Sequence, residues 1–148
     1  MNKVYATILL VIILTAAVGG YYYFFRPLRD TRIMIGGVVL MVELAVTKSE
    51  QVKGLSNRTS LPPDHGMLFI FDHGDYWGFW MTEMKFPLDI IWFNASRVAV
   101  FIEQNLQPCT PNDCPIYVPP FIAMYVLEVN ASFVSAHNIS LGTSFAFV

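Results

Sequence analysis

The stretch Pro-Leu-Asp-Ile-Ile-Trp-Phe, residues 87–93, is the part of the sequence that says most about the architecture. In an extended chain, its apolar side chains point to both sides, with Ile90 and Trp92 on one side and Ile91 and Phe93 on the other. A strand that is apolar on both faces is typically buried on both faces. We therefore expect a central strand here, covered by a packed layer on each side.

Short apolar runs flank this strand on both sides in the sequence, separated by turn residues at roughly the spacing of an all-β sandwich or barrel. A Gly36-Gly37 turn predicts a hairpin, and a capping box of Thr47 and Glu50 predicts a short helix that ends at Gly54. The expected strands are residues 33–35, 38–46, 67–71, 78–81, 89–93, 98–102, 124–128 and 144–148, with a helical turn at 132–138. The pattern predicts one compact, mostly β, barrel- or sandwich-like domain with one or two short helices.

The first part of the sequence is apolar. Residues 4–25 carry no formal charge and, as a helix, would measure about 33 Å, close to the thickness of a bilayer core. We expect a short tail (1–3), a single transmembrane anchor (4–25), a basic linker (26–32) and a β-rich domain (33–148). A cleaved signal peptide is the alternative, because Ala16 and Ala17 offer small residues to a peptidase.

Three sequence signals bear on which side of the membrane the β-rich domain lies, and they disagree. Three arginines follow the apolar segment, which favours a cytoplasmic domain by the positive-inside rule. Four Asn-x-Ser/Thr acceptors, Asn57, Asn94, Asn130 and Asn138, favour export and glycosylation. The only two cysteines, Cys109 and Cys114, share one loop and predict a disulfide, which also favours an oxidising space. We expect a single-pass protein of the cell membrane with its domain on the extracytoplasmic side.

The charge pattern excludes one class of partner. The formal charge is +3 up to Arg32 and −5 from Ile33 onward, so the domain has no basic stripe that could neutralise phosphates. We expect no nucleic-acid partner. The predicted partners are the lipid bilayer, through residues 4–25, and an envelope glycan or protein.

Several segments together resemble one known family. Residues GLSNR, GMLFIF, FWMTEMKFPLDIIWF, PCTPNDCP and YVLEVNAS, in this order from about residue 42 to the end, are similar to the domain of unknown function 192 family. The resemblance implies a compact, β-rich single domain and no established activity. The sequence departs from the family pattern at two places. Thr82, Glu83 and Met84 stand where the family usually has Lys-Asn-Thr, and Ser132 and Thr143 stand where it usually has a glycine and an acid, so the resemblance implies no role for those polar positions here.

Three polar residues are the candidates for catalysis. Asp89 lies at the start of the buried strand and needs a partner, for which Arg58, with its planar guanidinium, is our choice. Together with Glu83, they would act in an enzyme as acid, anchor and base. A structural ion pair is the simpler interpretation of Asp89 and Arg58.

Aromatic residues crowd the segment before the central strand. Most belong in the core, but Tyr76, Trp77 and Trp80 are candidates for a platform on which a sugar or a partner stacks. The acids and histidines at 64–65 and 72–75 flank a strand at opposite ends, and we expect no metal or other cofactor there. We therefore expect a membrane-anchored binding or structural module of the cell envelope, with a small hydrolase-like enzyme that uses buried carboxylates in a cleft as the alternative.

Overall fold

The computed structural model describes residues 12, 13, 15 and 29–148 of the chain. Among these residues, no helix is long and apolar enough to cross a membrane. The predicted anchor, apart from three of its residues, and the start of the predicted linker lie outside the described part of the chain. Both stay predictions from the sequence.

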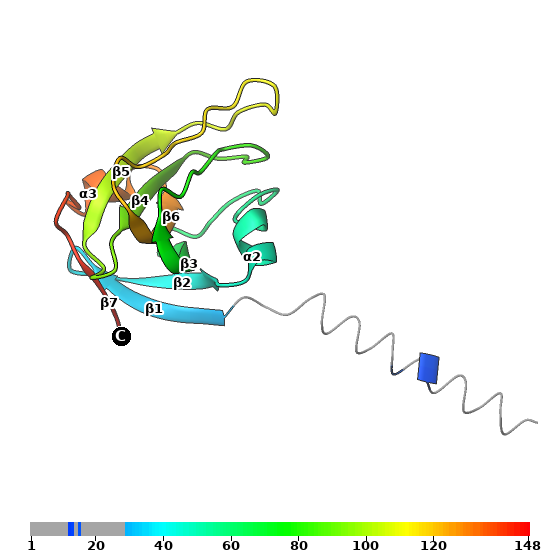
Figure 1. Cartoon of the computed structure of the whole chain (residues 1–148), viewed down its shortest axis with the longest axis horizontal. Coiled ribbons are helices and arrows are strands. Elements are labelled where there is room, and N and C mark those ends of the chain that lie inside the picture. Colours follow the sequence, from blue (N-terminus) through cyan, green and yellow to red (C-terminus); the bar gives the residue numbers. More distant parts are fainter. Residues whose placement is uncertain (1–11, 14, 16–28) are drawn as a thin grey trace, which may run out of the picture.

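One sheet of seven strands carries the domain, in the order β5-β4-β6-β3-β2-β1-β7 (Figure 1). The elements are β1 (Arg29–Ile35), β2 (Val38–Ala45), α2 (Lys48–Lys53), β3 (His65–Asp75), β4 (Leu88–Phe93), β5 (Ala99–Leu106), β6 (Ala123–Asn130), α3 (Phe133–Ala136) and β7 (Phe145–Phe147). All neighbours are antiparallel except β2 and β3, which run parallel and are connected through α2. The expected mostly β single domain with two short helices is confirmed.

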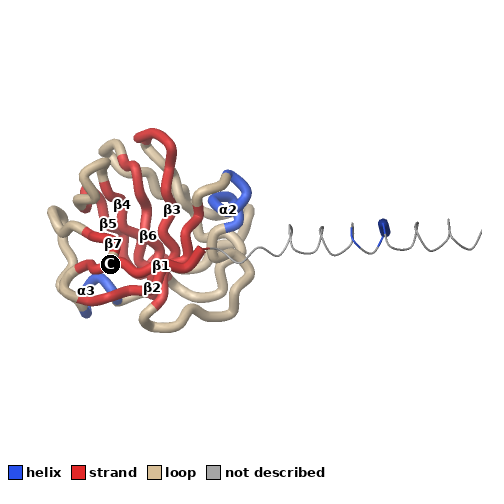
Figure 2. The backbone as a smooth tube through the Cα atoms, turned by 90° about the horizontal axis from the view of Figure 1, so that it is seen from below, coloured by secondary structure: helices blue, strands red, loops and turns tan. Residues whose placement is uncertain are grey.

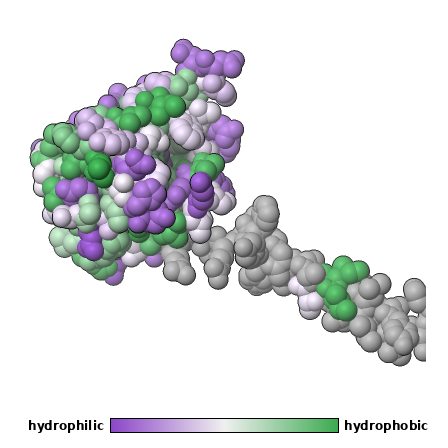
Figure 3. Space-filling model, in the orientation of Figure 1, coloured by the Kyte–Doolittle hydropathy of each residue, from purple (hydrophilic) through white to green (hydrophobic). Residues whose placement is uncertain are grey.

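The sheet curls into a half-barrel. Its edges approach each other where Val98 pairs with Ser144, and Ala99 N–H donates to the carbonyl of Thr143 at 2.8 Å. The two helices lie on opposite sides of the curled sheet (Figure 2). On the face seen in Figure 3, hydrophobic and hydrophilic side chains are interspersed over the domain.

Both faces of the sheet are covered, as the central strand predicts. All six residues of β4 are buried. Ile91 and Phe93 join an inner cluster inside the curl, whereas Ile90 and Trp92 join an outer cluster on the other face. The outer cluster is covered by α2 and by two long segments, residues 76–87 between β3 and β4 and residues 107–122 between β5 and β6.

The predicted local signals are confirmed in the first half of the domain. Gly36 and Gly37 have φ of +57° and +82° and close the hairpin between β1 and β2. Thr47 caps α2 by accepting from the N–H of Glu50, whose carboxylate accepts from the N–H of Thr47 at 2.8 Å. Gln51 then donates to the carbonyl of Ile70 at 2.9 Å, which fixes α2 against β3.

The expected strand at residues 78–81 is wrong. Within this segment Phe79 makes an isolated bridge with Tyr117, and directly after it Thr82 makes one with Cys109. The segment runs over the outer face of the sheet. Its aromatic side chains pack down onto the outer cluster, which fixes the segment as a cover rather than as a member of the sheet. High aromatic content favours a strand and an aromatic cover equally, so the sequence pattern could not separate them.

The predicted ion pair between Asp89 and Arg58 is also wrong. Asp89 is fully buried and accepts from two backbone N–H groups, Asn105 at 2.8 Å and Val134 at 2.9 Å. Arg58 instead forms two hydrogen bonds to Glu43, at 2.5 and 2.7 Å. Backbone donors satisfy a buried carboxylate as well as a guanidinium does, and they cannot be read from residue types.

We predict that Asp89→Asn lowers the free energy of unfolding by about 1–3 kcal/mol, because the amide presents one acceptor oxygen to two buried donors. Urea denaturation measures the effect. The effects of Asp89→Asn and Arg58→Ala should add, whereas Arg58→Ala and Glu43→Ala should show a coupling of roughly 0.5 kcal/mol or more. Strong coupling between Asp89 and Arg58 would instead support a direct pair between them.

Candidate functional site

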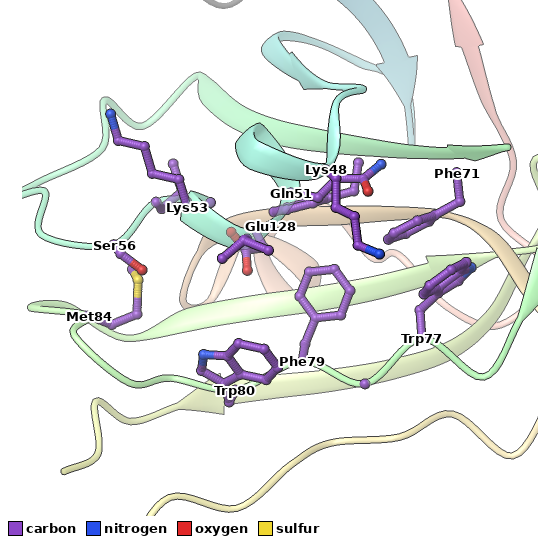
Figure 4. A pocket seen from close by; sticks show the side chains of 15 residues that line it. Lys48, Gln51, Lys53, Ser56, Phe71, Trp77, Phe79, Trp80, Met84 and Glu128 are labelled. Carbon is purple, nitrogen blue, oxygen red and sulfur yellow. The ribbon is translucent and has the colours of Figure 1, made fainter. Parts of the chain in front are cut away.

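A pocket of about 260 Å³ opens on the outer face of the sheet. It lies between α2 with the turn that follows it, the outer face of β3 and β6, and the covering segment before β4 (Figure 4). The aromatic side chains that line it are Phe69, Phe71, Trp77, Phe79 and Trp80. An apolar, concave site with few polar groups is the usual form of a small-molecule site.

The aromatic walls are held by ring contacts. Trp77 stacks on Phe71 with centroids 4.0 Å apart and an interplanar angle of 9°. Phe79 meets Phe69 edge to face at 4.8 Å. The indole N–H of Trp92 donates to the carbonyl of Trp77 at 2.8 Å, which ties the wall to β4. The pocket is therefore bounded by side chains with fixed orientations.

The disulfide loop, residues 107–122 between β5 and β6, packs against this wall. Cys109 and Cys114 are joined, as the sequence predicts. The loop pairs with the wall through reciprocal backbone hydrogen bonds between Phe79 and Tyr117, at 2.9 and 2.8 Å. A Cβ at Gly78 would lie 2.8 Å from Ile116, so glycine is required for this close approach. The loop thus fixes the position of the pocket wall.

Glu128 lies in the middle of the pocket, between α2 and the Phe79–Trp80 wall (Figure 4). It projects from β6, with Met67 of β3 and Ile90 of β4 as its neighbours in the sheet. Only 5% of the residue is exposed, and its Oε2 has no hydrogen-bond partner among the described residues. A buried carboxyl oxygen is normally satisfied by a protein group, a water, an ion or a ligand, so this atom can accept a partner that enters the pocket.

Burial decides the protonation of this carboxyl group. Removal from water raises the pKa of Glu128 to about 8, and the charge of Arg58 opposes this only in part. Arg58 is already paired with Glu43, which offsets its charge. At neutral pH Glu128 is therefore protonated, and it can donate a hydrogen bond.

Trp77 supplies a second polar atom of the same kind. Its Nε1 is buried and has no acceptor among the described residues. Gly54, in a positive-φ conformation at the end of α2, leaves the space above Glu128 open, because a Cβ there would lie 3.8 Å from Oε2 and 3.4 Å from Phe69. The pocket therefore combines aromatic walls with a buried carboxyl group whose Oε2 lacks a partner among the described residues.

None of the predicted catalytic candidates lines this pocket. Asp89 is held by backbone donors, and Arg58 is paired with Glu43. Glu83 is exposed and accepts from the side-chain amide of Asn57 at 3.1 Å. Asp89, Arg58 and Glu83 therefore each bond to a different partner. They form no common site, in the pocket or outside it.

The predicted aromatic candidates divide into two groups. Trp77 and Trp80 line the pocket, whereas Tyr76 is 53% exposed and does not. Glu128 was missed in the sequence. The signal that could have found it is a lone carboxylate in the otherwise apolar run AMYVLEV, on the same face of the strand as the buried Val126.

The acids and histidines around β3 pair locally. His65 bonds Asp64 at 2.8 Å, and His73 bonds Asp72 at 2.6 Å, which lowers the pKa of each aspartate. In the part of the chain that the structure describes, no three His, Cys, Asp or Glu side chains gather into a metal-binding group. The absence of a metal cofactor stays a prediction.

Comparison with known proteins places the chain in a family. The family model DUF192, described as Uncharacterized ACR, matches residues 31–147. The chain belongs to this family, as the sequence motifs predicted. No curated protein shows a significant similarity to it.

Two solved structures are similar to this chain in both fold and sequence. One is from Sinorhizobium meliloti 1021 and is described as a "putative transcription regulator"; it is 30% identical, with a TM-score of 0.76 over 82% of this chain and 95% of that one. The other is a protein of unknown function from Novosphingobium aromaticivorans DSM 12444. It is 31% identical, with a TM-score of 0.74 over 80% of this chain and 86% of that one.

We predict that Glu128 makes the domain less stable as the pH rises. The folded chain keeps this proton up to about pH 8, whereas the unfolded chain loses it near 4.5, the ordinary pKa of a glutamate side chain. Between these values the free energy of unfolding should fall by up to about 1.4 kcal/mol per pH unit, and Glu128→Gln should remove that slope. Urea denaturation from pH 5 to 9 measures it.

The matched control is Glu83→Gln, which changes an exposed carboxyl group and should keep the wild-type slope. If Glu128→Gln and wild type were to show parallel pH profiles, Glu128 would not be the buried acid described.

Proposed function

We propose that the domain is a small-molecule binding module whose pocket takes a compact, largely apolar ligand with at least one polar group. The observation that carries this proposal is the aromatic-walled pocket with the unpartnered Glu128 in its middle. Aromatic rings supply the contact area, and a few buried polar atoms supply orientation.

The composition of the pocket lining favours binding over hydrolysis. Glu128 is the one carboxyl group among the lining residues, and Ser56 is the one hydroxyl group. Apart from the exposed amines of Lys48 and Lys53, the lining contains no histidine, cysteine or second acid that could act with them as base or nucleophile. The enzyme alternative therefore has less support here than the binding module.

A role in nucleic-acid binding is not part of the proposal. The description of the Sinorhizobium meliloti protein concerns that protein. The net charge of −5 from Ile33 onward gives this domain little electrostatic attraction for phosphates.

We predict that the ligand site depends on Trp80 and not on Tyr76. Both side chains are about half exposed, but only Trp80 lines the pocket, so Tyr76→Ala is a matched control for the loss of an exposed ring. In a thermal-shift screen of single-ring and two-ring fragments, compounds that raise the Tm of wild type should also raise that of Tyr76→Ala. The same compounds should raise the Tm of Trp80→Ala much less. Equal Tm shifts in Tyr76→Ala and Trp80→Ala would place the binding site outside the pocket.

We also propose that the domain works tethered to the cell membrane on its extracytoplasmic side, as an envelope module. The support is the uncharged apolar segment 4–25 and the Cys109–Cys114 disulfide, which suits an oxidising space. Of the four acceptor sites, Asn57 and Asn138 are exposed, whereas the amide of Asn130 donates to the carbonyls of Leu61 and Pro62. Among them, Asn138 suits a glycan best, because the amide of Asn57 donates to Glu83.

Protease protection on intact cells or spheroplasts tests this location. We predict that added protease cleaves the domain without lysis, that the chain sediments with membranes, and that the two cysteines resist alkylation until they are reduced. Free thiols together with protection from external protease would place the domain in the cytoplasm. Glycopeptide mass spectrometry on the same material tests the acceptor sites.

A further inference from the structure

The three ionisable groups of the pocket share one chemical character. Lys48 and Lys53 of α2 line its rim and are exposed. Glu128, because burial raises its pKa to about 8, carries a proton at neutral pH. These three groups are all hydrogen-bond donors at pH 7, and two of them are cations; the neutral polar side chains of the lining are Gln51, whose amide N–H groups bond to the carbonyls of Ala45 and Ile70, and Ser56.

The surroundings of Glu128 add no negative charge that would reverse this character. From β2, Glu43 is occupied by two hydrogen bonds to Arg58, which follows α2. Met67 of β3, Ile90 of β4 and the aromatic wall carry no charge. The ionisable groups of the pocket therefore offer a ligand hydrogen-bond donors and positive charge.

From these observations, and resting on the proposed binding function, we infer that the pocket selects a compact organic anion: an apolar or aromatic body with an acidic head group whose oxygens accept hydrogen bonds from the pocket donors. The aromatic walls contact the body. Glu128 donates to an oxygen of the ligand, and Lys48 and Lys53 attract its charge.

An ammonium ligand is the main competitor, because aromatic rings beside a carboxyl group also form cation sites. Here an ammonium group would pass two lysines, and it would attract Glu128 only after that group had lost its proton. The two ligand classes thus have opposite pH dependence. The affinity for an anion falls as Glu128 ionises, whereas the affinity for a cation rises.

The test uses three probes with the same body: 3-phenylpropionate, 3-phenylpropanol and 3-phenylpropylamine. Each is titrated calorimetrically into the full chain in a nonionic detergent, with Trp80→Ala as the control for binding outside the pocket. We expect the propionate to bind at least about tenfold more tightly than the other two at pH 7, a difference of about 1.4 kcal/mol. Its affinity should fall about tenfold between pH 7 and pH 9, as Glu128 loses its proton.

Two variants separate the contributions. The double variant Lys48→Gln, Lys53→Gln should bind the propionate with an affinity within about threefold of that for the propanol. Its affinity for the propanol should equal that of wild type, because charge attraction acts only on the anion. Glu128→Gln keeps an N–H donor and should bind the propionate with little change from pH 7 to pH 9. It also guards against misfolding, because it replaces the acid with a neutral group of the same shape.

The outcomes are distinct. If the amine binds most tightly and gains affinity with pH, or if the three probes bind equally, the anion inference is overturned while the binding function stands. If none of the probes binds at millimolar concentration, or if all bind Trp80→Ala as well as wild type, both the inference and the proposed function fail.

Discussion

A central strand that is apolar on both faces must be covered on both faces, and this constraint organises the domain. β4 is buried along its whole length. The curl of the sheet covers its inner face by folding the sheet around the inner cluster. The outer face has no second sheet among the described residues, so α2, the aromatic segment before β4 and the disulfide loop must cover it instead. The burial of apolar area on both sides is the main favourable term in such a fold.

The pocket lies where this outer cover is incomplete. α2 and the aromatic segment leave a gap between them above β6, and the residue of β6 beneath that gap is Glu128. A carboxyl group at this position costs stability when it ionises, because neighbouring rings and aliphatic side chains replace its water. A chain selected for stability alone would carry an apolar residue there. The buried acid at this position is therefore one of the observations that support the proposed ligand site.

Local and periodic features were predictable from the sequence. The Gly36-Gly37 hairpin, the Thr47 capping box, the two-faced central strand and the cysteine pair each depend on neighbours in the chain. Contacts between distant segments were not predictable. Backbone donors from β5 and α3 hold Asp89, and Glu43 takes Arg58, because the folded backbone brings them there. The aromatic candidates Trp77 and Trp80 were found, but the acid beside them lies about fifty residues further along the chain.

The protonation state of Glu128 is the property on which the proposed site depends most. Carbon-13 NMR of the glutamate side-chain carboxyl groups, with Glu128→Gln to assign the signal, measures its titration in the folded chain. We expect a midpoint near pH 8, well above the ordinary glutamate value of 4.5. A midpoint near the ordinary value would mean that water or an unseen partner solvates the group. The donor-lined pocket, and the ligand chemistry drawn from it, would then be contradicted.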